Sequence, residues 1–328
     1  MGTTTEEASL LAAARGGDGP AFQALVAPYV PALQVHCYRM LASYHDAEEA
    51  TQETLLRAWR GLDGFEGRSP LLHWLYRIAT NTCLKARQVR DRRPVTVADV
   101  SYLEPYPDSL LDQLPAGGDP AAAAESRESV ALAYVAALQL LPATQRAVLI
   151  LREVLAWRAD EVAELLDTSV AGVNSALQRA RATLRTAPRA DRPLSTRERE
   201  AVRMFTAAWE RADIPALAAL LREDAALYMP PELAAVHGRA AIAEFFATVP
   251  NGGRLDQMPV RVIRANGQPA VAAYLPDPDG SFRAFGIVVL TVIDGAIATL
   301  TGFPIPKLFD AFGLPPTSLP VGGTADDL

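Results

Sequence analysis

The sequence predicts a multidomain chain, with two all-α domains followed by an α+β domain. Apolar residues recur at helical spacing over 21–93 and again from about residue 121 to 184. After residue 225 the pattern changes to short strand-like runs separated by turn signals. A chain of 328 residues is also long enough for two or three hydrophobic cores.

A first helical domain is expected over 21–94, after an N-terminal segment, 1–20. Its second helix runs from Asp46 to about Trp59 and is followed by a loop with three glycines. The stretch LLHWLYRIATNTCLKARQVRDRR then predicts a long helix with a basic end, which Pro94 stops.

An acidic linker, 95–120, is expected next. The stretch from Pro94 to Pro120 contains five prolines and few helix formers, which favours an extended tether over a domain. From Asp99 to Glu128 there are seven acidic residues and one arginine, whereas from Arg57 to Arg93 there are nine basic residues and three acidic ones. The net charge of -7 therefore hides a strongly basic segment followed by an acidic one.

The second helical domain, 121–187, has the layout of a helix-turn-helix. Trp157–Leu166 supplies a supporting helix, and a polar turn with an N-cap follows at 167–169. The buried stripe of the last helix consists of Val173, Leu177, Ala180 and Leu184. Its opposite face shows amide, hydroxyl and guanidinium groups, which suit base edges and phosphates in a major groove, so DNA is the first partner to consider. An ordinary solvated face of a helical bundle is the alternative.

The last part of the chain is divided into a linker, 188–196, a small α+β domain, 197–312, and a tail, 313–328. The domain is expected to begin with helices at 199–212 and 215–221. The expected strands are 226–229, 260–264, 270–274, 282–292 and 296–301, with hairpin turns at DPDG and IDG. The segment GFPIPKLFDAFGLP is expected in the domain core or at an interdomain contact, and the chain from Pro315 onward is expected to be disordered.

Several classes of site are not predicted. Cys37 and Cys83 lie in apolar helical contexts, so both are expected to be buried thiols in a reducing compartment, with no metal site and no cofactor. No apolar run reaches the roughly 18 residues of a membrane helix, and the first residues lack the pattern of a signal peptide. A soluble cytoplasmic protein with no membrane partner is therefore expected.

The strings DAEEATQETLLRAWRGLDGF and WLYRIATNTCLKARQVRDRRP, together with a helix-turn-helix behind an acidic linker, resemble the two conserved domains of a bacterial RNA polymerase sigma factor of the extracytoplasmic-function (ECF) type. This resemblance covers about Ala21 to Leu184. The segment 197–312 resembles a SnoaL-like domain, the cone-shaped α+β fold also used by steroid isomerases and limonene epoxide hydrolase. That second resemblance depends on the order of helices, the string PPELAAVHGRAAIAEFF and the closing hairpin.

The sigma resemblance implies a helical bundle, sigma domain 2, that binds core RNA polymerase through one polar helix face. Its partners in the family are the clamp coiled coil of the β′ subunit and, for the second domain, the β flap. A solvated helix face is the alternative for this surface. The residues implied are Asp46, Glu48, Glu49, Gln52, Glu53 and Arg57.

The resemblance also implies that the loop before the basic helix and the helix itself open the minus 10 DNA. Opening requires an aromatic surface for an unstacked base and a polar group to read its edge, and basic residues beyond them follow the phosphates. Core packing is nearly as good an interpretation of Trp74. The residues implied are Phe65, Arg68, Ser69, Trp74, Asn81, Lys85, Arg87, Arg90, Arg92 and Arg93.

In the second domain, sigma domain 4, the resemblance implies recognition of the minus 35 element. The small residues Ala171 and Gly172 are expected to permit close approach to the groove. The residues implied are Ser169, Ala171, Asn174, Ser175, Gln178, Arg179, Arg181 and Arg185. The acidic linker matches the segment that runs through the basic RNA-exit path of the polymerase in the family, although a merely disordered linker would look the same.

The role of the C-terminal domain stays open between a small-molecule sensor, a scaffold and an enzyme. Capping and turn roles explain most of its polar candidates for catalysis, which are Asp213, Asp224, Tyr228, His237 and Arg239. We therefore expect a promoter-specific sigma factor without catalytic residues, regulated by its own tethered C-terminal domain. The alternatives are a ligand-responsive helix-turn-helix regulator and a hydrolase or isomerase with a DNA-binding appendage.

Overall fold

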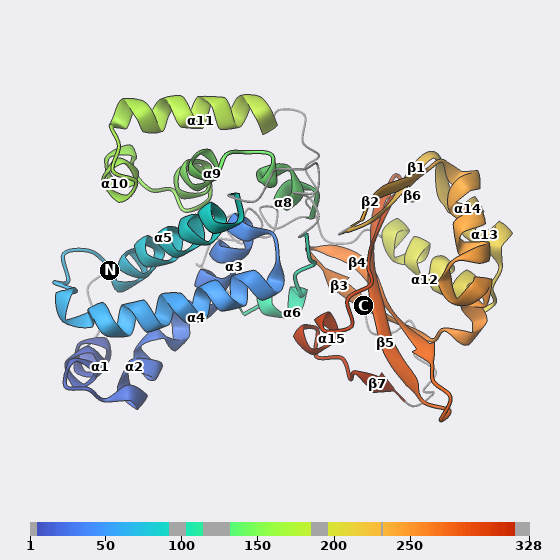
Figure 1. Cartoon of the computed structure of the whole chain (residues 1–328), viewed down its shortest axis with the longest axis horizontal. Coiled ribbons are helices and arrows are strands. Elements are labelled where there is room, and N and C mark those ends of the chain that lie inside the picture. Colours follow the sequence, from blue (N-terminus) through green and yellow to red (C-terminus); the bar gives the residue numbers. More distant parts are fainter. Residues whose placement is uncertain (1–4, 92–102, 114–131, 185–195, 231, 319–328) are drawn as a thin grey trace. The chain divides into compact units, whose positions relative to one another are not determined.

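The computed structural model describes residues 5–91, 103–113, 132–184, 196–230 and 232–318 (Figure 1). The chain divides into two compact units. A helical unit combines Met1–Thr96 with Leu110–Arg189, and a C-terminal unit combines Val97–Ser109 with Ala190–Leu328. Both predicted helical domains thus belong to one unit, and part of the acidic linker belongs to the other.

The first helical module, 5–91, is built around three mutually packed helices, α3, α4 and α5. Ser43 caps α4, because its Oγ accepts a hydrogen bond from the backbone N–H of Asp46 at 3.1 Å. Cys37 and Cys83 are buried free thiols, as predicted. The helices are α1 (Thr5–Arg15), α2 (Gly19–Val26), α3 (Val30–Leu41), α4 (Tyr44–Gly61) and α5 (Leu71–Asp91). The first of them, α1, was not predicted from the sequence.

The second helical module, 132–184, contains the predicted helix-turn-helix. Its elements are α8 (Leu132–Gln139), α9 (Ala143–Leu149) with a π-helical turn (Ile150–Val154), α10 (Ala159–Leu165) and α11 (Val170–Leu184). Val173, Leu177 and Ala180 of α11 are buried, as the helical spacing predicted, and Leu184 is half-buried. Ser169 caps α11, with its Oγ accepting from the backbone N–H of Gly172 at 3.0 Å.

A fully buried arginine joins the two helical modules. The guanidinium of Arg146 in α9 donates to the carbonyls of Leu138 and Leu141 in its own module, at 2.8 and 3.0 Å, and to the carbonyl of Met40 in α3. Beside it, the side-chain amide of Gln139 donates to the carbonyl of Arg39 at 3.4 Å. The two modules are therefore connected by hydrogen bonds to carbonyls at the C-terminal ends of α3 and α8, where helix carbonyls lack intrahelical partners.

The C-terminal unit is a strongly twisted sheet in the order β2-β1-β6-β5-β4-β3, with β7 paired to β5. β1 and β6 are parallel and the other pairs are antiparallel. The strands are β1 (Leu221–Met229), β2 (Glu232–His237), β3 (Val260–Ala265), β4 (Gln268–Pro276), β5 (Phe282–Ile293), β6 (Ala296–Phe303) and β7 (Thr317–Ser318). The hairpins predicted at DPDG and IDG connect β4 to β5 and β5 to β6.

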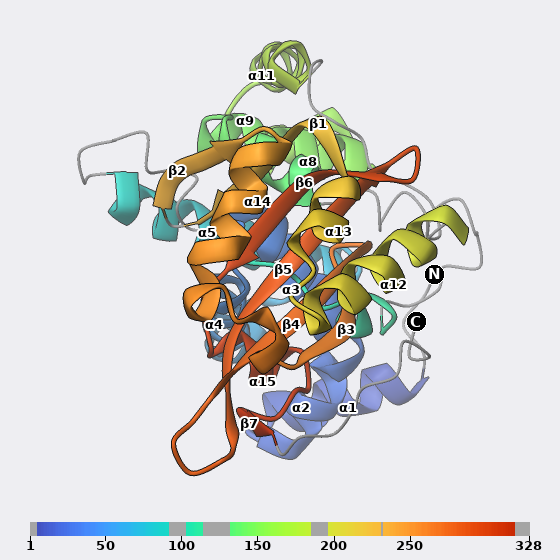
Figure 2. The same ribbon diagram turned by 90° about the vertical axis from the view of Figure 1, so that its right-hand side faces the viewer.

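Three helices, α12 (Thr196–Glu210), α13 (Ile214–Ala219) and α14 (Arg239–Thr248), cover one face of this sheet (Figure 2). Between them and the strands, the rings of Phe205, Trp209 and Phe246 contact one another with centroids 5.7 to 6.3 Å apart. The indole N–H of Trp209 donates to the carbonyl of Met258 at 3.0 Å. These aromatic side chains thus form part of the core between the helices and the sheet.

The segment that follows β6 packs back onto the C-terminal domain. The segment GFPIPKLFDAFGLP runs from the last two residues of β6 through a turn into α15 (Leu308–Ala311). Its Leu308 and Phe309 are fully buried, so it packs in the domain core. The expected disorder from Pro315 onward is wrong for 315–318. Pro316 accepts a hydrogen bond from Ala284, and Thr317–Ser318 pair with β5. The rest of the tail lies outside the described residues.

Part of the acidic linker docks on the turn between β3 and β4. The backbone of Tyr106 exchanges two hydrogen bonds with Asn266, whose Oδ1 accepts at 2.8 Å and whose N–H donates at 2.9 Å. Pro107 forms an antiparallel bridge with Ala265, and Tyr106 is fully buried. The described stretch 103–109 is therefore not a free tether, which the prolines and charge of the linker did not indicate.

Asp108, at the start of the short helix α6 (Asp108–Leu111), adds a charged clasp to this contact. One carboxylate oxygen accepts from the Nε of Arg264 at 2.9 Å, and the other accepts from the backbone N–H of Gly267 at 2.8 Å. The Asp108 side chain is 12% exposed and that of Arg264 is 40% exposed, so this ion pair is less screened by water than a pair of two exposed groups.

No helix among the described residues is long and apolar enough to cross a membrane.

A buried histidine gives the first module a pH-dependent stability. His36 in α3 is completely buried, with Nε2 at 2.9 Å from the hydroxyl of Thr80 in α5. Burial, helped by the nearby charge of Arg39, lowers the pKa of His36 from 6.5 to about 3. Between these values the unfolded chain binds a proton at His36 and the folded chain does not, so falling pH favours unfolding by up to about 1.4 kcal/mol per unit.

We therefore expect the His36→Gln variant to lose less stability than the wild type when the pH is lowered from 7 to 5. Urea unfolding followed by the helical circular dichroism signal at pH 7 and pH 5 measures the loss in free energy of unfolding. The losses of the wild type and the variant should differ by about 2 kcal/mol. His45→Gln, at a partly buried position, is the control and should follow the wild type. An identical pH dependence of the wild type and the His36→Gln variant would contradict this assignment.

The cap of α11 makes a second prediction. Ser169→Ala removes the acceptor for the Gly172 N–H and should lower the free energy of unfolding by about 1 kcal/mol. Ser169→Asp keeps an acceptor and should retain most of that stability. Chemical denaturation followed by circular dichroism distinguishes the two variants, and equal losses would show that the hydrogen bond is not the cause.

Candidate functional site

Helix α4 presents three of its predicted polymerase-binding side chains outward. Glu48, Glu49 and Gln52 are exposed, whereas Asp46 is half-buried in the first turn of the helix. Leu56, one turn beyond Gln52, is 50% exposed. The sequence interpretation overlooked this leucine, although an apolar residue on the polar side of an amphipathic helix is the signal for it. The outward face therefore combines acidic groups with an apolar contact.

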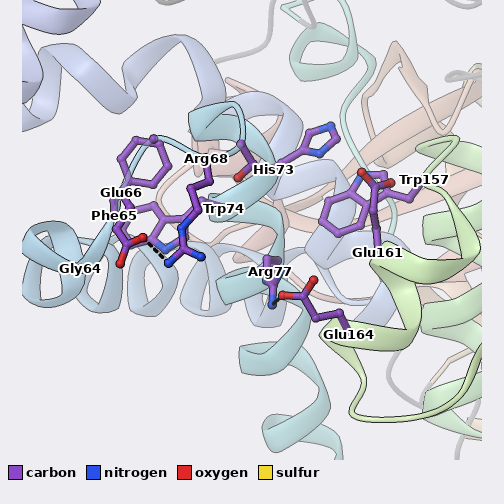
Figure 3. Close-up of a pocket in the computed structure, with 12 residues that line it drawn as sticks. Gly64, Phe65, Glu66, Arg68, His73, Trp74, Arg77, Trp157, Glu161 and Glu164 are labelled. Atoms are coloured by element: carbon purple, nitrogen blue, oxygen red, sulfur yellow. Dashed lines mark hydrogen bonds and ion pairs between the residues drawn. The ribbon is translucent and has the colours of Figure 1, made fainter.

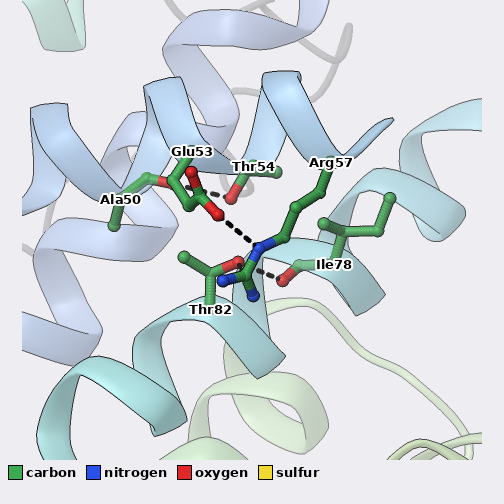
Figure 4. A network of polar contacts seen from close by, with 6 residues as sticks. All are labelled: Ala50, Glu53, Thr54, Arg57, Ile78 and Thr82. Atoms are coloured by element: carbon green, nitrogen blue, oxygen red, sulfur yellow. Dashed lines mark hydrogen bonds and ion pairs between the residues drawn. The ribbon is translucent and has the colours of Figure 1, made fainter. Parts of the chain in front are cut away.

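The other two predicted residues of α4 face α5 instead (Figure 4). The Nε of Arg57 donates to Glu53 Oε1 at 2.7 Å, and Arg57 Nη1 donates to the hydroxyl of Thr82 at 3.2 Å. Thr82 in turn donates to the carbonyl of Ile78 at 2.9 Å. Arg57 thus contributes to the packing of α4 on α5, in addition to any role at the surface.

An aromatic cavity of about 530 Å³ lies between the loop before α5 and the second module (Figure 3). Phe65 and Trp74 contact each other with ring centroids 5.1 Å apart, and Phe65 is only 6% exposed. The predicted residues Arg68 and Ser69 line the cavity and are exposed, with Arg68 paired to Glu66. Of the predicted minus 10 residues, the structure thus brings Phe65, Arg68, Ser69 and Trp74 together, with Phe65 beneath the surface, whereas Asn81 does not line the cavity.

One stripe of α5 extends from this cavity along the helix. Trp74 is half-buried, and Asn81 and Lys85, two and three turns further on, are exposed. His73 and Arg77 continue the same stripe at intervals of four residues and line the cavity, but neither was among the predicted residues. Their spacing from Asn81 and Lys85 is the sequence signal that would have identified them.

The other predicted phosphate contacts of the first module are buried or lie outside the described part of the structure. Arg87 is only 6% exposed, so it does not present its guanidinium at the surface in this structure, and its contact with a phosphate stays a prediction. At the end of α5 its position turns toward the core, because the polar stripe follows residues 77, 81 and 85. Arg90 lies in α5, but its side chain is outside the described atoms, and Arg92, Arg93 and Arg185 are outside the described residues.

The predicted DNA-reading face of α11 is exposed along its described length. The exposed members are Ser169, Ala171, Asn174, Ser175, Gln178, Arg179 and Arg181. Arg181 is paired with Glu153 at 2.5 Å. A Cβ at Gly172 would lie 2.7 Å from the hydroxyl of Thr168, so this glycine serves the turn itself, in addition to any approach to DNA.

Local partners account for most of the polar candidates in the C-terminal unit. Asp213 caps α13 by accepting from Ala216 N–H at 3.0 Å, and Arg239 pairs with Glu223 at 2.9 Å. Exposed Asp224 pairs with Arg222 at 2.9 Å. Tyr228, 42% exposed, contacts the ring of His237 edge-on. The capping role predicted for Asp213 is confirmed.

Three protein families match successive parts of the chain. Sigma-70 region 2 matches residues 25–93, Sigma-70 region 4 matches 131–184, and the SnoaL-like domain matches 202–300. These matches cover the first helical module from residue 25 onward, the second helical module and most of the C-terminal sheet domain.

Among curated relatives, the chain is 41% identical over 322 residues to ECF RNA polymerase sigma factor SigG of Mycobacterium tuberculosis, covering 92% of this chain and 85% of the relative. It is 32% identical over 170 residues to ECF RNA polymerase sigma factor SigW of Bacillus subtilis, covering 52% and 89%. The crystal structure of Mycobacterium tuberculosis extracytoplasmic function sigma factor SigJ has the same fold, with a TM-score of 0.61 and 23% identity over 88% of this chain and 98% of that one. With both sigma regions in order and a relative that spans nearly its whole length, this chain belongs to the ECF family of RNA polymerase sigma factors.

Proposed function

We propose that this sigma factor directs core RNA polymerase to promoters with two elements. The first module opens the minus 10 DNA and the second reads the minus 35 element, while the polymerase makes the RNA. The observation that carries the proposal is the exposed face of α11. Together with its cap Ser169, this face presents seven polar or small side chains to solvent. Side chains at the N-terminal end of such a helix reach base edges in the major groove.

For the polymerase contact, we assign the outward face of α4. Glu48, Glu49 and Gln52 supply charge and hydrogen-bonding groups, and Leu56 supplies an apolar anchor. This combination suits a helical partner such as the β′ clamp coiled coil, because apolar burial gives affinity and charge selects the register. These proposed partners place the protein's activity in the cytoplasm.

For the minus 10 element, we assign the aromatic cavity and the α5 stripe. A base removed from its stack loses stacking energy, and the ring of Trp74, backed by Phe65, offers a new surface for it. Asn81 can read a base edge, and Lys85 with Arg90, Arg92 and Arg93 can neutralise phosphates.

For the minus 35 element, we assign Asn174, Ser175 and Gln178 to base edges and Arg179, Arg181 and Arg185 to phosphates. Ser169 and Ala171 lie at the entrance of the helix into the groove. A phosphate would compete with Glu153 for Arg181, and both groups are exposed enough for such an exchange.

We further infer that the C-terminal domain regulates initiation by binding rather than by catalysis. It holds linker residues Tyr106 and Asp108, which connect the two promoter-reading modules. A linker held in this way is not free to follow a path through the polymerase. We assign no small-molecule ligand to this domain.

Run-off transcription with purified core polymerase tests the proposed function. The full chain, or a version ending near Ala187, should give transcripts that depend on the promoter sequence. Absence of such transcripts with both versions would refute the sigma role.

Within this assay, glutamine-to-alanine substitutions in α11 and in α4 should have different effects. Gln178→Ala should change the preference for minus 35 sequences by about 1–3 kcal/mol at one position, whereas Gln52→Ala should weaken association with the polymerase without changing promoter choice. Asn81→Ala should shift the preference at the minus 10 element. Competition between promoter variants measures the choice, and equal, sequence-independent losses for all three variants would contradict the assignments.

The linker clasp predicts a gain of activity. Asp108→Ala and Arg264→Gln change the net charge in opposite directions but break the same ion pair. Both should raise transcription severalfold at limiting sigma concentration, because the linker is released. Effects in opposite directions would indicate a nonspecific influence of charge, and no change in either variant would exclude the clasp as a regulator.

A further inference from the structure

Helix α10 of the second module lies against the α5 stripe of the first. The indole of Trp157, immediately before α10, stacks on the ring of His73 with centroids 4.8 Å apart and planes at 17°. It also meets Tyr76 edge-on at 6.5 Å, and is only 3% exposed. The modules therefore share a specific aromatic contact beside the cavity assigned to promoter opening.

The same helix supplies carboxylates to that cavity (Figure 3). Glu164 Oε1 accepts from Arg77 Nη2 at 2.9 Å, and Glu161 lines the cavity together with Arg68. An aromatic face on His73 and a carboxylate on Arg77 are the groups that a stacked base and a phosphate would offer to the same side chains. α10 thus presents to the stripe the chemistry of the single-stranded DNA that the stripe is proposed to bind.

The packed arrangement is also incompatible with reading two promoter elements at once. Elements about 25 base pairs apart are separated by roughly 85 Å along the duplex. A compact unit of about 170 residues has a radius of gyration of only about 16 Å. The two modules must separate before both elements can be bound.

We propose that α10, with the Trp157 that precedes it, is a built-in competitor of promoter DNA. It is a latch that adds to the Arg146 contact between the modules and covers the part of the α5 stripe at His73 and Arg77 until the polymerase and the promoter displace it. This inference rests on the proposed sigma function. The ion pair is weak enough to be reversible, since the side chains of Arg77 and Glu164 are 38% and 70% exposed. A latch of this kind lowers the apparent affinity for DNA by the fraction of molecules that are open.

The test compares Glu164→Gln with Asp160→Asn in the full chain with core polymerase. Each removes one negative charge from α10, but Asp160 pairs with Arg158 of its own module rather than with α5. At limiting sigma concentration, Glu164→Gln should increase the yield of open promoter complexes about three- to tenfold. Asp160→Asn should leave the yield near that of the wild type.

A reversible lock provides the second measurement. Arg77→Cys combined with Glu164→Cys, joined by a short cleavable dithiol-reactive cross-linker, should block open-complex formation, and reductive cleavage should restore it in the same protein. If the wild type transcribes but Glu164→Gln and Asp160→Asn behave alike, or the cross-linked protein stays active, the latch is refuted while the sigma function stands. If neither the wild type nor any variant supports promoter-dependent transcription, the sigma function itself fails.

Discussion

The contact between the two helical modules depends on a fully buried positive charge, that of Arg146. Arg146 has no exposed surface, and a guanidinium removed from water is tolerated only when its donors are satisfied. Carbonyls at the ends of α3 and α8 provide the acceptors, and these helix ends also carry partial negative charge. Because the acceptors come from both modules, the packing of α9 in its own module and its contact with α3 are parts of the same polar network.

The contact between α10 and α5 differs from this network in strength. Arg77 and Glu164 remain partly in water, so their attraction is modest and sensitive to salt. A promoter phosphate offers Arg77 an equivalent partner with a much larger charge density. The helical unit thus has a firmly joined region around Arg146 and an exchangeable region around the aromatic cavity, and separation of the modules must overcome the first.

Much of the fold could be predicted from the sequence because the patterns were strong and local. The helix-turn-helix, the long basic helix and five strands appear where apolar periodicity and hairpin turns placed them. The exposed α11 face followed from the buried stripe at Val173, Leu177 and Ala180. Edge strand β2 was missed, because short edge strands carry a weak alternating pattern.

The remaining differences depend on tertiary contacts. Burial of Arg87 and the inward turn of Arg57 could not be read from residue type, since arginine at a helix surface serves phosphates and neighbouring helices equally well. Glu164 and Trp157 have no local signal for their contacts with α5.

The turn at Asn266 and Gly267 has a consequence for how the linker can vary. Both residues have positive φ, 57° and 72°, as a two-residue Asn-Gly hairpin turn requires. Asn266 forms hydrogen bonds with the backbone N–H and carbonyl of Tyr106, so these bonds do not involve the Tyr106 side chain. The hydrogen bonds of the turn thus require an extended backbone and the carboxylate at position 108, whereas the side chain at position 106 is constrained by its complete burial.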